Sequence, residues 1–344
     1  MLYLCSVSNR LTEIAEYTGL SESTISRVLN ARKGVAESTR TAVLTAVDVL
    51  GYERPNKLKS QVDRVVGVVI PQLDNPIFPA FAAAVGGHLN QRGFTPLVAV
   101  TESGGPSEGD YVRTLFRRQV AGVVFISGLH AVTGLDHSHY KQLMERRLPL
   151  VTIDGISPDL DLACVSTDDA TAVTLAARHL TQLGHRRLGL AISDEEHVPG
   201  ARKRRAFTEF IDANPEVSGQ IDRSFYSLEG GMSAATHLIS AGATAIICGS
   251  DVMALGAIKA ARKLSLRVPE DISVVGFDDS LFMSLVEPPV TTIRQPVEAM
   301  ARAAVGLLVA QISGRESRSG ELLFEPELVV RSSTGPANHH QRDG

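Results

Sequence analysis

Cysteine and aromatic residues are scarce in this chain of 344 residues, and tryptophan is absent. The three cysteines, Cys5, Cys164 and Cys248, lie far apart without CxxC spacing. This pattern argues against a disulfide framework and against a zinc site. It is typical of a protein of the reducing cytoplasm, where we expect this protein to be located.

Long apolar runs and enzyme motifs are also missing. No stretch is long and apolar enough to cross a bilayer, and the N-terminal segment MLYLCSVSN lacks the basic start and cleavage site of a signal peptide. The chain contains no GxxxxGK[ST], no GxGxxG after a predicted strand and no GxSxG. We therefore predict a protein without membrane segment, cofactor, metal ion or catalytic residues, and we interpret the N-terminal segment as an extra arm.

The composition fits two or three α/β domains. Hydrophobic residues make up 44% of the chain, and the net charge is −4. Residues 1–64 carry nine Lys and Arg against seven Asp and Glu, so this part is weakly basic and the rest is acidic. A weakly positive segment on an acidic body is compatible with a few contacts to DNA phosphates.

The segment LTEIAEYTGLSESTISRVLN, at 11–30, has the pattern of two short helices that cross at a steep angle. Ala15 allows close packing, Gly19 suits the turn, and Ile25 packs back from the second helix. Ser21 can cap the second helix, whose outer face is polar. A helix-turn-helix places such a face in the major groove of DNA, although an ordinary helical hairpin has the same pattern.

A third helix is predicted from about Ser38 to Leu50, with apolar residues at helical spacing that cover the hairpin. Residues 1–51 are therefore the predicted DNA-binding domain. Residues 52–64 are polar and basic and contain a proline, which indicates a linker.

From residue 65 onward, short β-branched runs alternate with amphipathic stretches, as in parallel sheets with helices on both faces. We predict a small all-α helix-turn-helix head and an α/β body of two doubly wound parallel-sheet lobes, which bind ligands at the carboxyl ends of their strands. The predicted strands are 65–70, 96–100, 122–127, 150–154, 187–192, 221–226, 243–249 and 272–278. The predicted helices are 78–92, 107–118, 138–146, 169–183, 201–213, 231–240 and 251–265.

Several motifs resemble the family of lactose and galactose repressors. Residues 24–30, TISRVLN, match the recognition helix of that family. VPEDISVVGFDDS at 268–280 and TTIRQPVEAM at 291–300 resemble its two-lobed sugar-binding core, which is similar to periplasmic binding proteins. GYERP, NPIFP and PELVVR are most similar to the actinobacterial maltose-operon repressors of this family.

The resemblance implies that the effector-binding and dimerisation domain, 65–335, crosses three times between its lobes. Lobe one would be 65–165 and 294–323, lobe two would be 166–293 and 324–335, and 336–344 would be a tail.

The predicted DNA face consists of short polar and basic side chains. Arg27 can donate two hydrogen bonds to a guanine, and Asn30 lies one turn further along. By resemblance, Glu22 and Ser23 select operator bases, but Glu22 can equally be a favourable charge at a helix start. The full set is Ser21, Glu22, Ser23, Thr24, Ser26, Arg27, Asn30, Thr39, Arg40 and Leu58.

Leu58 is the candidate for insertion into the minor groove, which family members achieve with a longer hinge. The linker of this chain is shorter, so a flexible basic tether is the alternative.

Effector-binding side chains are predicted at strand ends. Asp154 and Asp278 each end an apolar strand, where a carboxylate has little structural reason to be. A sugar needs carboxylates and amides for its hydroxyl groups and an aromatic side chain for its apolar face. The resemblance places effector contacts at Asn75, Phe78, Ser127, Asp154, Asp251, Asp278 and Gln295.

Two assignments stay open. Asp251 is placed equally well to cap the helix that it begins. Where the family usually has an arginine, this chain has Lys203 with Arg202 beside it, so either can hold the effector or both can belong to a solvated basic face.

The predicted function is a transcriptional repressor whose affinity for a near-palindromic operator is controlled by a small sugar. The resemblance implies maltose or a maltodextrin, while another sugar, a purine or a corepressor remain alternatives. We expect a homodimer, because the C-terminus has no leucine heptads for a tetramer. A solute-binding protein would need export, and an enzyme would need a better catalytic pair than the adjacent Asp278 and Asp279.

Overall fold

The computed structural model of the protein describes residues 3–30, 32, 34–50, 52, 64–101, 105–193, 196–315 and 319–338. The chain forms two compact units, Met1–Arg64 and Val65–Gly344. Cys164 and Cys248 are buried free thiols.

The first unit contains three helices, α1 (Tyr3–Thr18), α2 (Glu22–Leu29) and α3 (Glu37–Val49). Gly19 takes a φ of 68° between α1 and α2, a conformation that glycine adopts without steric cost. Ile14, Ile25 and Val43, one from each helix, are buried in a common core. The segment interpreted as an arm is instead part of α1, because helical hydrogen bonding continues through it to Tyr3.

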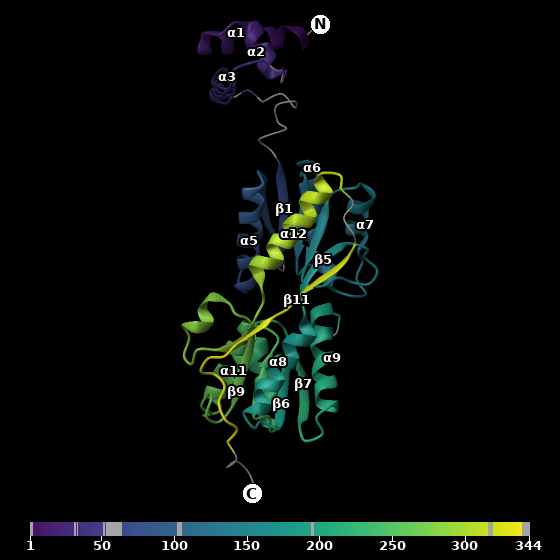
Figure 1. Cartoon of the computed structure of the whole chain (residues 1–344), viewed down its shortest axis with the longest axis vertical. Coiled ribbons are helices and arrows are strands. Elements are labelled where there is room, and N and C mark those ends of the chain that lie inside the picture. Colours follow the sequence, from purple (N-terminus) through teal and green to yellow (C-terminus); the bar gives the residue numbers. More distant parts are fainter. Residues whose placement is uncertain are drawn as a thin grey trace. The chain divides into compact units, whose positions relative to one another are not determined.

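The second unit contains two six-stranded sheets, one in each lobe (Figure 1). The sheet of lobe one has the order β11-β5-β4-β3-β1-β2. Its strands are β1 (Val65–Ile70), β2 (Thr95–Val100), β3 (Gly122–Ile126), β4 (Leu150–Ile153), β5 (Ala163–Thr167) and β11 (Gly320–Phe324). All of their pairings are parallel.

The sheet of lobe two has the order β12-β10-β9-β8-β6-β7. Its strands are β6 (Arg187–Ile192), β7 (Ser218–Arg223), β8 (Ala245–Cys248), β9 (Ser273–Asp278), β10 (Thr291–Arg294) and β12 (Glu327–Val329). Only the pairing of β10 with β12 is antiparallel among those of the described residues. The fold is thus the predicted one, with helices on both faces of two parallel sheets.

Successive residues of a strand point to opposite faces, so each sheet supplies two cores. In lobe one, Val68 packs with the helices α5 (Ile77–Gln91) and α12 (Val297–Ile312), and Val69 packs with α6 (Glu108–Arg117) and α7 (Ser138–Glu145). In lobe two, one core contains α8 (Asp169–Gln182) and α9 (Val198–Asp212), and the other contains α10 (Leu228–Ser240) and α11 (Asp251–Lys263). Short 3₁₀ turns lie at Leu129–Ala131 (η1) and Leu281–Ser284 (η2).

The chain crosses between the lobes after β5, β10 and β11, a residue or two beyond the expected positions. Two crossings are joined directly, because the backbone N–H of Asp168 donates to the carbonyl oxygen of Phe324 over 2.8 Å. The carboxyl ends of both sheets consequently lie beside these crossings.

Strand β7 differs from its prediction, which placed it at 221–226. It covers 218–223 and is the edge strand of its sheet, where polar side chains face water. The apolar residues Phe225 and Tyr226, which suggested a later strand, lie beyond its end. Strands β5, β10, β11 and β12 were not among the predicted strands, since these short segments are defined by pairing rather than by apolar alternation.

Candidate functional site

Helix α2 presents a polar face. Its Ile25 and Val28 are buried, whereas Glu22, Ser23 and Arg27 are exposed. The hydroxyl oxygen of Ser21 accepts the backbone N–H of Thr24, which confirms the predicted cap. Thus the exposed side chains of the second helix point away from the core that holds the hairpin together.

Several predicted DNA-contacting residues also make contacts within the unit. The carboxylate of Glu22 accepts a hydrogen bond from the Thr12 hydroxyl over 2.7 Å. The side-chain amide of Asn30 donates to the carbonyl oxygen of Ser26 over 2.8 Å and closes the end of α2. Thr39 and Arg40 are half-buried on α3, and Leu58 lies outside the described residues.

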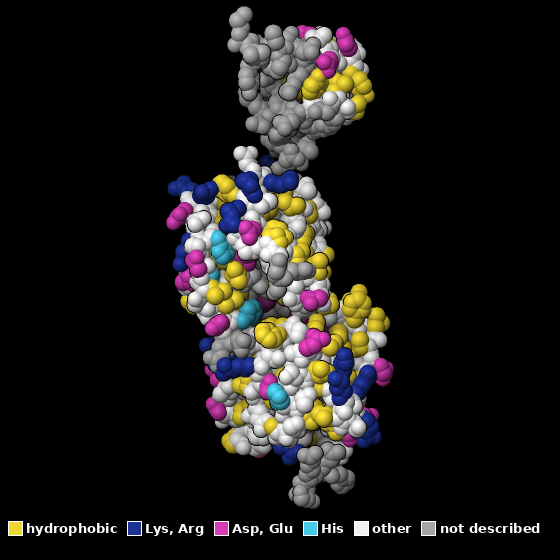
Figure 2. Space-filling view, turned by 180° about the vertical axis from the view of Figure 1, so that it is seen from behind, with side chains coloured by type: hydrophobic (Ala, Val, Ile, Leu, Met, Phe, Trp, Pro, Cys, Tyr) yellow, Lys and Arg dark blue, Asp and Glu magenta, His cyan; other side chains and the backbone are white. Residues whose placement is uncertain are grey.

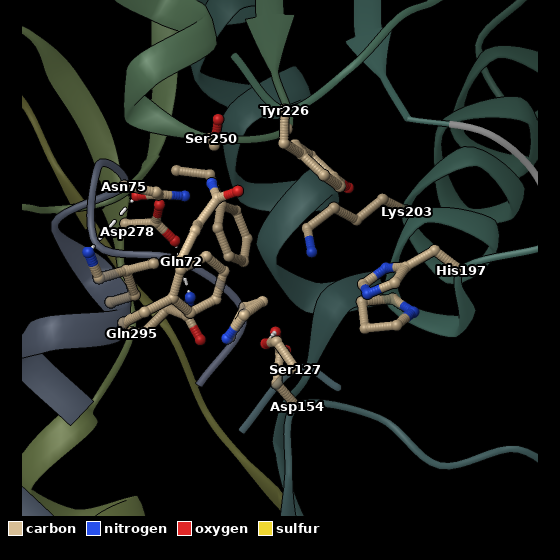
Figure 3. A pocket seen from close by; sticks show the side chains of 16 residues that line it. Gln72, Asn75, Ser127, Asp154, His197, Lys203, Tyr226, Ser250, Asp278 and Gln295 are labelled. Carbon is tan, nitrogen blue, oxygen red and sulfur yellow. Dashed lines mark hydrogen bonds between the residues drawn. The ribbon is translucent and has the colours of Figure 1, made fainter. Parts of the chain in front are cut away.

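A cavity lies between the two lobes and is lined by residues of both (Figure 3). Its walls come from the carboxyl ends of strands in both sheets and from helix starts that follow them. The predicted effector residues that the fold brings together around it are Asn75, Phe78, Ser127, Asp154, Lys203, Asp278 and Gln295.

One wall of the cavity is an amide–carboxylate pair. The Gln295 side-chain amide donates to Asp278 Oδ1 over 2.7 Å, and its carbonyl oxygen accepts the Thr167 hydroxyl over 2.7 Å. Asp278 Oδ2 is buried and has no hydrogen-bond partner. Burial, and then the charge of Asp251, raise the pKa of Asp278 well above its usual value. A ligand hydroxyl group would satisfy the free oxygen.

Ser127 and Asp154 form a second wall, where the Ser127 hydroxyl donates to the Asp154 carboxylate. Both residues have positive backbone φ angles, 46° for Ser127 and 74° for Asp154, which are unusual for residues other than glycine. Strain of this kind persists only where the surrounding fold holds it, and it is concentrated at functional sites.

Lys203 lies in the cavity wall as half of a buried ion pair. Its Nζ is 2.5 Å from Asp169 Oδ1 and 4.0 Å from the ring centre of Phe277. Burial raises the pKa of Asp169 to about 6. Burial alone would lower the pKa of Lys203, but the charge of Asp169 more than offsets this and the pKa is raised. Both groups therefore carry charge at neutral pH, and the negative charge of Asp169 compensates the positive charge of Lys203.

The sequence prediction missed the aromatic part of the cavity, His197 and Tyr226. Their rings meet edge to face, with centres 6.0 Å apart. Burial lowers the pKa of His197 to about 4, so its imidazole is neutral at pH 7. Tyr226 lies three residues beyond β7, so the correct end of β7 would have indicated it, whereas His197 lies five residues beyond β6, too far from the strand end for that rule.

Two predicted effector residues do not line this cavity. Asp251 is fully buried and accepts hydrogen bonds from the Ser280 N–H and hydroxyl and from the Thr292 hydroxyl. It does not cap α11 either, since Ser250 occupies that position. Arg202 points to lobe one and forms a two-pronged ion pair with Glu321. Helix geometry separates Arg202 from Lys203, because adjacent residues of a helix point about 100° apart, and only Lys203 lines the cavity.

Within the described residues, no helix has the length and apolar character that crossing a membrane requires. The same residues contain no group of three or more His, Cys, Asp or Glu side chains that could hold a metal ion.

A helix-turn-helix unit and a two-lobed α/β unit with a cavity between its lobes together define a DNA-binding transcriptional regulator with a periplasmic-binding-protein-like domain. Residues 10–56 match "Bacterial regulatory proteins, lacI family", and residues 177–334 match "Periplasmic binding protein-like domain". The chain belongs to the LacI family of bacterial transcriptional regulators.

Individual relatives are similar over nearly their whole length. The HTH-type transcriptional regulator MalR of Streptomyces coelicolor is 45% identical over 96% of this chain and 98% of its own. The structure of the lac repressor dimer bound to operator and the anti-inducer ONPF has a TM-score of 0.77 and 26% identity, covering 94% of this chain and 98% of that one. The complex of the transcriptional regulator CelR with cellobiose has a TM-score of 0.70 and 28% identity, covering 94% and 99%.

Replacing Lys203 by Met should lower the free energy of unfolding by about 3–5 kcal/mol at pH 7, because Asp169 is left as a buried charge without a partner. In this variant the native-state pKa of Asp169 lies above the unfolded value of about 3.9, so the loss grows as pH rises from that value and levels off above the native-state pKa. Urea unfolding between pH 4 and pH 8 measures this. The double variant Lys203→Met with Asp169→Asn is the control and should recover most of the loss at pH 7. A single variant as stable as the original protein at pH 7 would contradict the pairing.

Proposed function

We propose that this regulator is a repressor whose operator affinity is controlled by a neutral sugar bound between the two lobes. The observation that carries the proposal is the cavity itself, where Asp278 Oδ2 is a buried hydrogen-bond acceptor without a partner. Sugar hydroxyl groups are donors that such an oxygen requires.

The charges around the cavity favour a neutral ligand. The ammonium group of Lys203 is already paired with Asp169, and Asp154 adds a carboxylate to the wall. A phosphate or carboxylate ligand would therefore be repelled by the negative charge in the wall. The rings of Phe78, Tyr226 and Phe277 offer apolar surface for the faces of a pyranose.

We propose maltose or a short maltodextrin as the sugar. The 45% identical relative from Streptomyces coelicolor is named MalR, which supports this choice. CelR, a more distant relative, binds cellobiose in its solved complex. The genes repressed would then be those for uptake and use of the same sugar.

We infer that the exposed face of α2 reads operator bases. Glu22, Ser23 and Arg27 project from this helix, and Ser26 and Asn30 extend the same polar surface. Arg27 can read guanine in the major groove, while the hydroxyls of Ser21, Thr24 and Thr39 and the guanidinium of Arg40 are suited to phosphate.

A second copy of the chain supplies the other reading head of a near-palindromic operator. Lobe two carries exposed apolar residues on and beside η2, with Leu281 77% and Leu285 75% exposed. Figure 2 shows hydrophobic side chains gathered on a projecting part of this lobe. An apolar cluster of this kind favours burial against a partner. The sugar must bind the two arrangements of the lobes unequally, because only differential affinity changes operator binding.

Substituting Glu22→Gln should alter the choice of one operator base pair by about 1–3 kcal/mol and leave affinity for random DNA nearly unchanged. Gln keeps an acceptor for the Thr12 hydroxyl, so α2 stays in place. Binding to an operator library with every base varied in turn measures the effect. Equal changes on operator and random DNA would reduce Glu22 to a charge at the helix start.

Maltose should bind the full chain and weaken operator binding about 5–150-fold, which corresponds to 1–3 kcal/mol of coupling. Calorimetric titration with glucose, maltose and maltotriose, with and without operator duplex, tests this. Asp278→Asn should lower maltose affinity about tenfold or more, because the buried acceptor is lost. Asp212→Asn, at the exposed end of α9, is the matched control. Tighter operator binding in the presence of maltose would indicate that maltose is a corepressor. Absence of maltose binding would refute maltose as the effector.

The paired substitution Leu281→Glu with Leu285→Glu should convert the proposed dimer into monomers, since charges replace the apolar contact. Sedimentation velocity of the original and altered chains at equal concentration measures the change. A variant that still sediments as a dimer would move the interface elsewhere.

A further inference from the structure

Arg202 and Glu321 join the two lobes outside the cavity. Arg202 lies on α9 of lobe two, and Glu321 lies on β11, the edge strand of the lobe-one sheet. The two guanidinium nitrogens are 2.7 and 2.5 Å from the two carboxylate oxygens, so the pair is bidentate. Their side chains are 26% and 17% exposed, which shields the pair from much of the solvent. Bidentate geometry and partial burial make an ion pair stronger than an ordinary surface pair.

The start of α9 touches lobe one at two further points. The Thr133 N–H donates to the carbonyl oxygen of Glu196 over 2.7 Å, beside an antiparallel bridge between Val132 and His197. A Cβ atom added to Gly155 of lobe one would lie 2.8 Å from Cδ of Pro199, so the Pro199 ring packs closely against the Gly155 backbone. Arg202 is thus the last of a series of contacts that attach the first turns of α9 to lobe one.

The neighbour of Arg202 along α9 is Lys203, which lines the cavity and pairs with Asp169. Asp169 follows β5 in the chain, and Glu321 lies on β11, which pairs with β5. Two consecutive residues of α9 therefore bind two carboxylates, one on β11 and one at the start of α8, directly after the neighbouring strand β5. Rotation or sliding of α9 would have to break both contacts, and it would move Lys203 in the cavity wall.

We propose that the ion pair between Arg202 and Glu321 is a latch that positions α9, and through it Lys203, for effector binding. It acts without touching the effector, because both residues lie outside the cavity. This inference rests on the proposed function only for the identity of the ligand. In the arrangement described, both lobes line the cavity, so the latch stabilises the arrangement that binds the effector.

Two measurements test the latch in the full chain. The first is the distance distribution between spin labels at Glu145→Cys on lobe one and Asp212→Cys at the end of α9, with Cys5→Ser to remove another thiol. The second is maltose affinity by calorimetry. Each is made for Arg202→Gln, Glu321→Gln and the double variant, with Arg205→Gln as the matched control. Arg205 lies on the same helix, with a side chain 71% exposed, and contacts only Glu209 among the ion pairs described for it.

The latch predicts broader interlobe distances without ligand and about 5–20-fold weaker maltose binding in each single variant, with the double variant no worse than either single one. Arg205→Gln should match the original protein in both measurements. Urea unfolding of each variant separates this result from general loss of folding. Unchanged distances in both single variants would overturn the latch.

The remaining outcomes separate the two proposals. Broader distances with unchanged maltose affinity would overturn the positioning role. Broader distances in a protein whose original form does not bind maltose would support the latch and refute the proposed sugar.

Discussion

The buried ion pair of Lys203 and Asp169 is the interaction on which the rest of the cavity depends. A charge inside a protein is costly unless an opposite charge or hydrogen bonds compensate it, and losing one partner of a buried ion pair costs about 3–5 kcal/mol. Lys203 belongs to α9, and Asp169 begins α8 directly after the crossing strand β5. The pair therefore keeps a helix of lobe two against the segment that joins the lobes. The pair also compensates the positive charge of Lys203, which would otherwise attract an anionic ligand.

Around this pair, the topology brings together side chains that are far apart in the chain. Parallel strands of one sheet end at the same edge, and the three crossings bring the ends of the two sheets to one cavity. Ser127, Asp154 and Asp278 stand at such strand ends with positive φ angles of 46°, 74° and 123°. Local preference does not favour these conformations in residues with a side chain. Packing and hydrogen bonds in two lobes hold them, so the cavity is formed at the expense of local strain.

The fold was predictable because its signals are periodic and local. Alternation of β-branched runs with amphipathic helices indicated two parallel sheets, and the polar face of α2 with its Ser21 cap indicated the helix-turn-helix. Strand ends also revealed two residues of the cavity, since Asp154 and Asp278 are unusual after apolar strands. The failures were of another kind. Asp251 was predicted to contact the effector, as Asp278 was, but its carboxylate already accepts hydrogen bonds from the hydroxyls of Ser280 and Thr292.

The sequence by itself determined which segments become helices and strands, which helix presents polar groups, and which strands end in carboxylates. These properties depend on residue type and spacing over a few turns. Only the tertiary structure decided that Lys203 faces the cavity while Arg202 reaches Glu321, and that His197 and Tyr226 complete the lining. The rotation of a helix about its axis and the partner of a buried charge depend on contacts between distant segments, 34 residues apart for Lys203 and Asp169 and 119 apart for Arg202 and Glu321, which no local pattern encodes.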